Sequence, residues 1–213
     1  MNKILSVGGF QPCQNEVTNI ESGSTCEEFV PDFPLGYLYG AVIGLIDNQP
    51  TVYTGNCDFE SDCWSKHCYQ YNKSLNVFVK NDSISIVHPV EFAAYAAWQD
   101  RTIILAGGNQ GARDKTNLIQ VVGSHLTWTM PINLTESCMV HLHGDTYLLM
   151  GGYSSSYEHI DDSYVFTPYQ NGTLNWTEGP KLQNGRSGHA CGVMERNGKR
   201  YVVVVGGSPP FLH

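Results

Sequence analysis

The sequence predicts an all-β protein built as a β-propeller, or as a segment of one, and two observations carry this prediction. Short apolar runs that end in glycine recur along the chain of 213 residues, at steps of 47, 52, 44 and 55 residues. A repeat length near 50 residues is typical of propellers and related arrays. Each unit also contains strand-like runs and no helical pattern, and four such strands make one propeller blade.

The recurring glycines mark the end of one strand in every unit. They close the runs ILSVGG, TVYTGN, TIILAGG, YLLMGG and YVVVVGG. The positions are Gly8 and Gly9, Gly55, Gly107 and Gly108, Gly151 and Gly152, and Gly206 and Gly207. A strand end with positive φ, or one packed tightly against a neighbouring unit, favours glycine because a Cβ is excluded there. No phosphate-loop pattern surrounds these glycines, so we interpret them as structural positions.

The other strands of a unit surround the glycine-ending strand. Before it comes an apolar run and a short turn, predicted at Asp47-Asn48, Gln99-Asp100, Gly144-Asp145 and Asn197-Gly198. After it come a longer loop, a third strand such as DSYVFTP, and a fourth strand that carries Trp128 or Trp176. The units are expected at residues 1–35, 36–90, 91–134 and 135–184. Residues 185–213 are expected to supply the inner two strands of a further or ring-closing unit.

The order of a glycine pair, a Tyr or aliphatic strand, a Trp and a basic residue resembles the kelch repeat. The fullest match is the unit with Gly151, Gly152, Tyr164, Trp176 and Arg186. The resemblance covers almost the whole chain and implies a kelch-type β-propeller with about four four-stranded blades. Because kelch propellers usually have six or seven blades, it implies a partial or incomplete ring. Closure of a four-bladed ring by the strand around Cys191 is the alternative.

Four of the seven cysteines flank loops in equivalent places. Cys13 and Cys26 flank the loop after the glycine pair of the first unit, and Cys57 and Cys68 flank that of the second. We expect a disulfide in each pair, and two such disulfides favour an oxidising compartment. A metal site built from Cys57, Cys63, Cys68 and His67 is the alternative. The cysteine spacings of five and four intervening residues differ from the short C-x-x-C type pairs of zinc sites.

The predicted inner strands carry further cysteines and histidines. Cys138 and Cys191 are expected as small buried hydrophobic residues, and a disulfide between neighbouring units is the alternative. His141 and His143 alternate on one strand, so they are expected to share a face and, with His189, to line the centre of the ring. We interpret them as a polar lining rather than as copper or zinc ligands, since no further ligand accompanies them at matched spacing. No metal or other cofactor is expected.

Composition and short motifs bound the location of the protein. The formal net charge is −8 and no basic block is present, which argues against nucleic-acid binding. No apolar run approaches the ~20 residues that span a bilayer, so no membrane insertion is expected. Five acceptor sequences for N-glycosylation occur in turn-like stretches, at Asn72, Asn81, Asn133, Asn171 and Asn175. The N-terminus lacks the apolar core of a secretory signal. We therefore expect a segment of a longer secreted glycoprotein, with a cytoplasmic location as the alternative.

The expected function is non-catalytic: an extracellular scaffold that binds a protein or glycan ligand. Loops on a repetitive scaffold carry recognition, so the longest loops hold the best candidates. These candidates are Arg113, Lys115, Tyr153, Tyr157 and His159. An intracellular kelch adaptor, which recruits a client to a ubiquitin ligase or to actin, is the first alternative. A fragment of a secreted copper radical oxidase is the second, although no Tyr–Cys constellation with matched ligands is evident.

Overall fold

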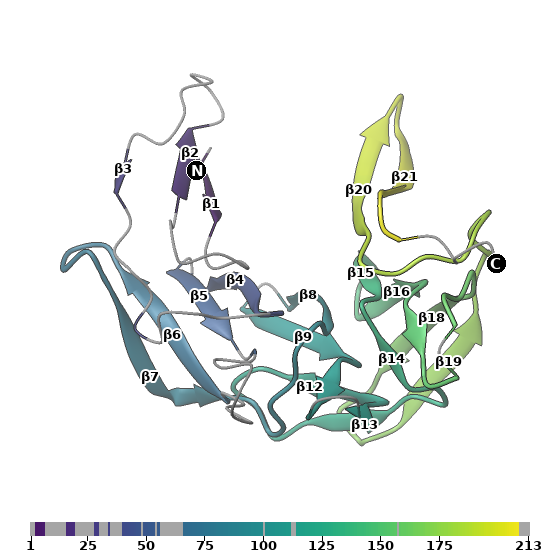
Figure 1. Ribbon diagram of the computed structural model, residues 1–213, viewed down its shortest axis with the longest axis horizontal. Coiled ribbons are helices and arrows are strands. Elements are labelled where there is room, and N and C mark those ends of the chain that lie inside the picture. Colours follow the sequence, from purple (N-terminus) through teal and green to yellow (C-terminus); the bar gives the residue numbers. More distant parts are fainter. Residues whose placement is uncertain are drawn as a thin grey trace.

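The computed structural model describes residues 3–6, 16–19, 28–29, 34, 40–47, 49–53, 55, 66–99, 101–111, 114–156 and 158–208. These residues form strands and turns and no helix, which confirms the all-β prediction. In this part of the chain, accordingly, no helix has the length and apolar character needed to cross a membrane. The strands lie in antiparallel sheets that follow one another along an open arc (Figure 1).

Three of the sheets have four antiparallel strands each, in the order of the sequence. The first contains β4 (Val42–Ile46), β5 (Gln49–Tyr53), β6 (His67–Asn72) and β7 (Val77–Ser85). The second contains β8 (Ala94–Trp98), β9 (Thr102–Ala106), β12 (Leu118–Val121) and β13 (Thr127–Thr129). The third contains β15 (Cys138–His143), β16 (Thr146–Met150), β18 (Ser163–Pro168) and β19 (Leu174–Glu178). Each sheet lies within one of the units expected from the sequence.

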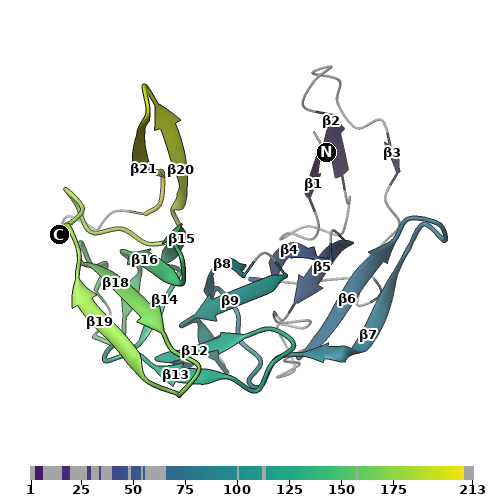
Figure 2. The same cartoon turned by 180° about the vertical axis from the view of Figure 1, so that it is seen from behind.

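Smaller sheets stand at the two ends of the arc (Figures 1 and 2). One end holds β1 (Lys3–Ser6), β2 (Glu16–Asn19) and β3 (Glu28–Phe29), and the other holds β20 (Ala190–Arg196) and β21 (Lys199–Val205). Two short pairs lie between them: β10 (Asn109–Gln110) with β11 (Asp114–Lys115), and β14 (Leu134–Thr135) with β17 (Tyr153–Ser154). Among the described strands, β20 pairs only with β21. Closure of a ring by pairing of β20 with the sheet of β1, β2 and β3 is therefore not observed in this part of the chain.

The turns between the first two strands of the units adopt the backbone that their residues favour. The first turn residue has positive φ in all four hairpins: Asp47 (49°), Gln99 (48°), Gly144 (53°) and Asn197 (54°). Such backbone matches the twist of two strands joined by a tight turn. The predicted turn positions are therefore confirmed where the structure describes them; Asn48 and Asp100 lie outside the described residues.

The largest apolar core fills the space between the second and third four-stranded sheets. The Trp98 ring lies 5.9 Å from the Trp128 ring within its own sheet and 6.1 Å from the Tyr147 ring of the next. Trp128 is buried, and its indole N–H donates a hydrogen bond of 3.0 Å to the carbonyl of Tyr169 in the next sheet. This indole thus joins two units, as large rings with one polar group do in cores. Trp176 is half-buried and stacks on Tyr164, with ring centroids 4.8 Å apart.

Gly151 and Gly152 combine positive φ with close contact to neighbouring backbone. Their φ values are 57° and 112°. A Cβ on Gly151 would lie 2.7 Å from the ring of His189 and 2.8 Å from the carbonyl of Arg186, both in the following unit. A Cβ on Gly152 would meet Ser137 Oγ and would lie 2.9 Å from the carbonyl of Thr135. Both physical reasons given for these glycines therefore hold.

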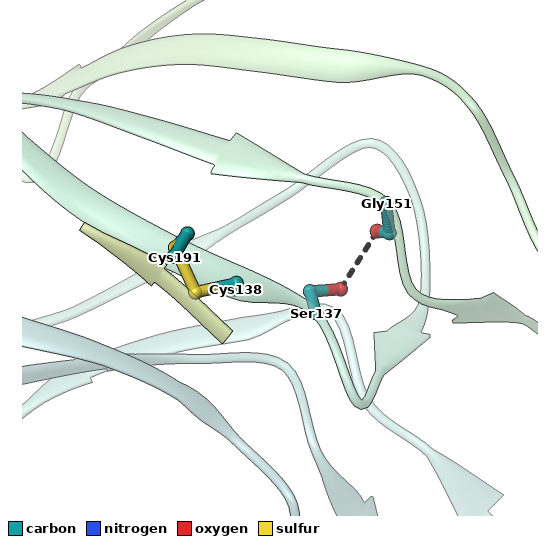
Figure 3. The surroundings of a disulfide bond; sticks show 4 residues. All are labelled: Ser137, Cys138, Gly151 and Cys191. Carbon is teal, nitrogen blue, oxygen red and sulfur yellow. Dashed lines mark hydrogen bonds between the residues drawn. A yellow bond between two sulfur atoms is a disulfide. The ribbon is translucent and has the colours of Figure 1, made fainter. Parts of the chain in front are cut away.

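A disulfide joins Cys138 of β15 to Cys191 of β20, with the two Cα atoms 5.9 Å apart (Figure 3). The expectation of two unlinked hydrophobic residues is wrong, and the alternative of a bond between units is correct. Cys138 lies opposite Met150, which directly precedes the glycine pair of its unit. Cys191 lies opposite Val204, which is separated from the glycine pair of its own unit by one residue. Because side chains alternate between the faces of a strand, this offset of one residue turns the two cysteines toward each other.

The β20–β21 hairpin uses one face to pack on the third four-stranded sheet. Val202 and Val204 pack with Cys191 against Val140, Leu148 and Met150. The Arg200 guanidinium donates to the carbonyl of Leu142 and adds a polar contact. The other face exposes apolar side chains, among them Met194, Tyr201 and Val205. The disulfide is therefore one of only a few attachments between this hairpin and the neighbouring sheet in the described part of the chain.

Cys68 is a free thiol and not part of a disulfide, so the expected Cys57–Cys68 bond is wrong. Its side chain is fully buried in the core between the first two four-stranded sheets, together with Val42, Tyr53 and Ile103. Burial raises the pKa of this thiol to about 12, which keeps it protonated and unreactive. Cys13, Cys26, Cys57 and Cys63 lie outside the described residues, as do Gly8 and Gly9.

Gly152→Ala is expected to lower the free energy of unfolding by roughly 2–4 kcal/mol. The new Cβ would be strained at this positive φ and would also overlap Ser137 and Thr135. The matched control is Gly144→Ala, which also has positive φ but places its Cβ more than 4 Å from any neighbour. This control should lose only about 1 kcal/mol. Urea unfolding measures both values, and an equal loss in the two variants would show that packing at Gly152 contributes nothing.

The double variant Cys138→Ala/Cys191→Ala is expected to release the hairpin of β20 and β21. We expect amide hydrogen exchange in this hairpin to accelerate at least tenfold, and the free energy of unfolding to fall by roughly 2–4 kcal/mol. Cys68→Ala is the control, because it removes a thiol from a core on the far side of the second sheet. If exchange in the hairpin is unchanged in the double variant, apolar contacts alone hold it in place.

Candidate binding site at the glycine ends of the sheets

A line of backbone hydrogen bonds crosses four consecutive units just before the first strand of each. The N–H of Phe92 donates to the carbonyl of Gly40 (2.9 Å), that of Glu136 to Phe92 (3.0 Å), and that of Gly188 to Glu136 (2.9 Å). All four residues have positive φ, between 53° and 64°. The repeated hydrogen bond brings the backbones of neighbouring units into direct contact and fixes the spacing of the groups around it.

Beside this line, a row of paired residues crosses the unit that contains the second four-stranded sheet. Glu91 and Asn109 exchange two backbone hydrogen bonds, of 3.1 and 2.9 Å, and Asn109 lies opposite Lys115 in the β10–β11 pair. The Asn109 side-chain amide also donates to Glu91 Oε1 at 3.3 Å. The row therefore runs from the buried carboxylate of Glu91 through Asn109 to Lys115.

The next unit repeats the row with different side chains. Thr135 lies opposite Tyr153 in the β14–β17 pair, and Tyr153 forms a β-bridge with His159. Lys115 and His159 therefore occupy equivalent positions, as do Asn109 and Tyr153. The fold holds the backbone of both rows constant, while their side chains differ. This is the part of the repeat in which neighbouring units carry different chemistry.

Three of the five loop residues singled out in the sequence meet at the junction of these two rows. Lys115 Nζ lies 4.6 Å from the centre of the Tyr153 ring, within the range of a cation–π contact. The His159 ring also lies beside the Tyr153 ring, with the two ring centroids 5.0 Å apart. All three side chains are half-buried, so each reaches the surface. Arg113 and Tyr157 lie outside the described residues.

Glu136 belongs to the same surface and was not identified from the sequence. Its Oε2 accepts a hydrogen bond of 2.6 Å from Ser187 Oγ in the following unit. Burial lowers the pKa of Lys115, and the charge of Glu136 opposes that shift. Glu136 also holds a positive φ at the position where two other units have glycine, and such strain in a side chain-bearing residue marks a candidate functional position. Aligning the units on their glycine pairs would have placed Glu136 against Gly40 and Phe92, whereas Gly188 falls out of that alignment because β20 and β21 are longer than β15 and β16.

Buried polar atoms without a protein partner gather in the two rows. Seven such side-chain atoms occur among the described residues, and four of them are Glu91 Oε2, Asn109 Oδ1, Thr135 Oγ1 and His159 Nδ1. Burial, together with the charge of Glu136, raises the pKa of Glu91 against the effect of its hydrogen bond to Asn109. Buried polar groups are normally satisfied, so this concentration indicates that water or a ligand completes the hydrogen bonding here.

The histidines of the inner strands do not form a metal centre. The pairing of β15 with β16 shifts register between His141 and His143, and the ring of His141 bonds to the carbonyl of Gly144. The expectation that the two histidines share a face fails because of this bulge. In the part of the chain that is described, no group of three or more His, Cys, Asp or Glu side chains is placed to hold a metal ion.

The glycosylation candidates occupy two kinds of place. Asn171 lies in a turn and Asn72 ends β6 directly before one, and their side-chain oxygens accept hydrogen bonds from the residues that follow. Asn81 and Asn175 lie within the outermost strands β7 and β19, so their assignment to turns is wrong. Outermost strands carry polar side chains that face solvent, which explains the misreading. Asn133 is half-buried between β13 and β14.

Comparison with known proteins supports the architecture alone. No protein-family model and no curated protein matches the chain, whereas 117 chains of solved structures do. One of them, described as the structure of YjhT, superposes with a TM-score of 0.66 at 13% sequence identity. The alignment covers 99% of this chain and 75% of that chain. At this identity the likeness defines the class: an all-β protein with repeated antiparallel sheets.

His189 should make stability depend on pH, because its buried ring packs against Gly151. Burial and then the charge of Arg186 lower its pKa below the usual 6.5. A histidine whose pKa is lowered by folding contributes stability above its unfolded pKa and loses that contribution as the pH falls. We expect the urea midpoint to fall between pH 7.5 and 5.5, and to fall less in His189→Gln. Equal pH dependence in both proteins would exclude His189 as the source.

Proposed function

We propose that this protein is part of a kelch-type β-propeller that acts as a non-catalytic extracellular scaffold and binds a protein or glycan ligand. The observation that carries the proposal is the contact of Lys115, Tyr153 and His159 across two neighbouring units. A cation, an aromatic ring and an imidazole that meet on a rigid repeat are suited to recognition. We name the surface formed by Lys115, Glu136, Tyr153 and His159 the row junction.

Several features of the fold support the propeller. The four-stranded sheets pack face to face, and aromatic residues such as Trp98, Trp128 and Tyr147 fill one interface. Gly151, at the end of β16, touches Arg186 and His189 of the following unit, and the backbone hydrogen bonds from Gly40 to Gly188 join consecutive units. Radial repetition of this kind leaves the loops at one end of the sheets available for binding.

The disulfide supports an extracellular location. Cys138 and Cys191 are bonded across two units, and such bonds persist in oxidising compartments. The exposed turn at Asn171 offers an accessible acceptor for a glycan, and glycosylation belongs to the same compartment. A reducing cytosol would not maintain the disulfide, which weighs against the intracellular adaptor.

The test is a binding survey with matched variants. The purified secreted protein is applied to a panel of immobilised glycans and extracellular matrix proteins, and affinity is measured by biolayer interferometry. We expect Tyr153→Ala and Lys115→Ala each to lower the affinity for the ligand about tenfold, which corresponds to about 1.4 kcal/mol of binding free energy. Tyr169→Ala is the control, because Tyr169 is 48% exposed and follows the far end of β18. Ligands that bind equally to all three variants, or that are chemically converted, would contradict the proposal.

A further inference from the structure

We infer that the row junction recognises the hydroxyl groups of an uncharged glycan. The inference rests on the proposed binding function and names the ligand class of that same surface. It depends on the mixture of donors and acceptors that Lys115, Glu136 and Tyr153 place together, and on the buried polar atoms in the same two rows.

The junction carries charges of both signs. Lys115 supplies an ammonium group and Glu136 a carboxylate, and the two interact electrostatically. A phosphate or carboxylate ligand would face Glu136, with Glu91 behind it, and a cationic ligand would face Lys115. A hydroxyl group donates one hydrogen bond and accepts others, so one hydroxyl can contact an ammonium and a carboxylate at once. The neutral, hydroxyl-rich ligand is the one that meets no like charge.

The groups are held in position before a ligand arrives. Lys115 comes from β11, Glu136 from the segment between β14 and β15, and Tyr153 from β17. The N–H of Glu136 is bonded to the carbonyl of Phe92, and its Oε2 is bonded to Ser187 Oγ. A carboxylate has two oxygens that each accept more than one hydrogen bond, so Glu136 can also accept from a ligand hydroxyl. Side chains fixed in this way lose little conformational entropy on binding, which favours affinity.

Buried polar atoms in the same two rows extend this preference. Thr135 is 2% exposed and Glu91 is 7% exposed, and each has a buried oxygen without a protein partner. Asn109 Oδ1 lies in the same row as Glu91. Ordered water is the usual partner of such atoms, and a water bridge to a ligand is nearly as favourable as a direct hydrogen bond. Hydroxyl groups fit such a water network because they can replace or extend its hydrogen bonds.

The experiment compares neutral and acidic probes on the whole chain. The neutral probes are the methyl glycosides of glucose, galactose, mannose and N-acetylglucosamine; the acidic probes are glucuronate and inorganic phosphate. Binding is measured by ligand-observed NMR and by calorimetric titration. We expect at least one neutral glycoside to bind with a millimolar Kd, and both acidic probes to bind at least tenfold more weakly.

Variants locate the site. Glu136→Gln removes a charged acceptor with little change of shape and should lower the affinity for the neutral glycoside about tenfold. The matched control is Glu158→Gln, which changes the same charge on an exposed residue of the adjacent loop and should leave the affinity unchanged. The urea midpoints of both variants establish that the fold is intact.

Three results would overturn the inference. The first is tighter binding of glucuronate or phosphate that strengthens in Glu136→Gln, which would define an anion site. The second is glycoside binding that is unaffected by Glu136→Gln and Lys115→Ala. The third is no glycoside binding while a protein from the earlier survey binds and responds to Tyr153→Ala; the scaffold function would then stand and the ligand class would be wrong. If no probe and no member of that survey binds, both proposals fail.

Discussion

The structure depends on direct contact between the backbones of consecutive units. At one end of the sheets, an N–H of each unit donates to a carbonyl of the unit before it, from Gly40 to Gly188. All four residues of this line have positive φ, and the glycine pairs beside it also have positive φ where the structure describes them. Apolar packing fills the interfaces further out, but the short hydrogen bonds set how close one sheet stands to the next.

The same constraint creates the chemistry of the row junction. Short strands that pair beside the backbone line hold their polar groups away from bulk water, so part of their hydrogen bonding is left for water or a ligand. Glu136 takes a strained backbone conformation that glycine adopts elsewhere in the repeat, and in return its carboxylate reaches Ser187 and the neighbourhood of Lys115. Structural strain and surface chemistry therefore meet in one residue.

The features that could be predicted from the sequence are those that depend on local pattern. Period, turn residues and alternating apolar runs indicated the strands and the places of Gly151, Gly152 and Trp128, because each unit repeats them. The free thiol of Cys68 and the bond between Cys138 and Cys191 could not be read from spacing alone, because they depend on the face of the sheet to which each side chain points. Glu136 was missed for a related reason: its significance arises only when units are superposed and their backbones compared.

The bond between Cys138 and Cys191 encloses the whole third four-stranded sheet and Tyr153 within one covalent loop. The exposed turn at Ser155 and Ser156 lies inside that loop and resembles the sites that proteases cut first. A single nick there would leave both fragments covalently attached, and the nicked chain would run as one species until it was reduced.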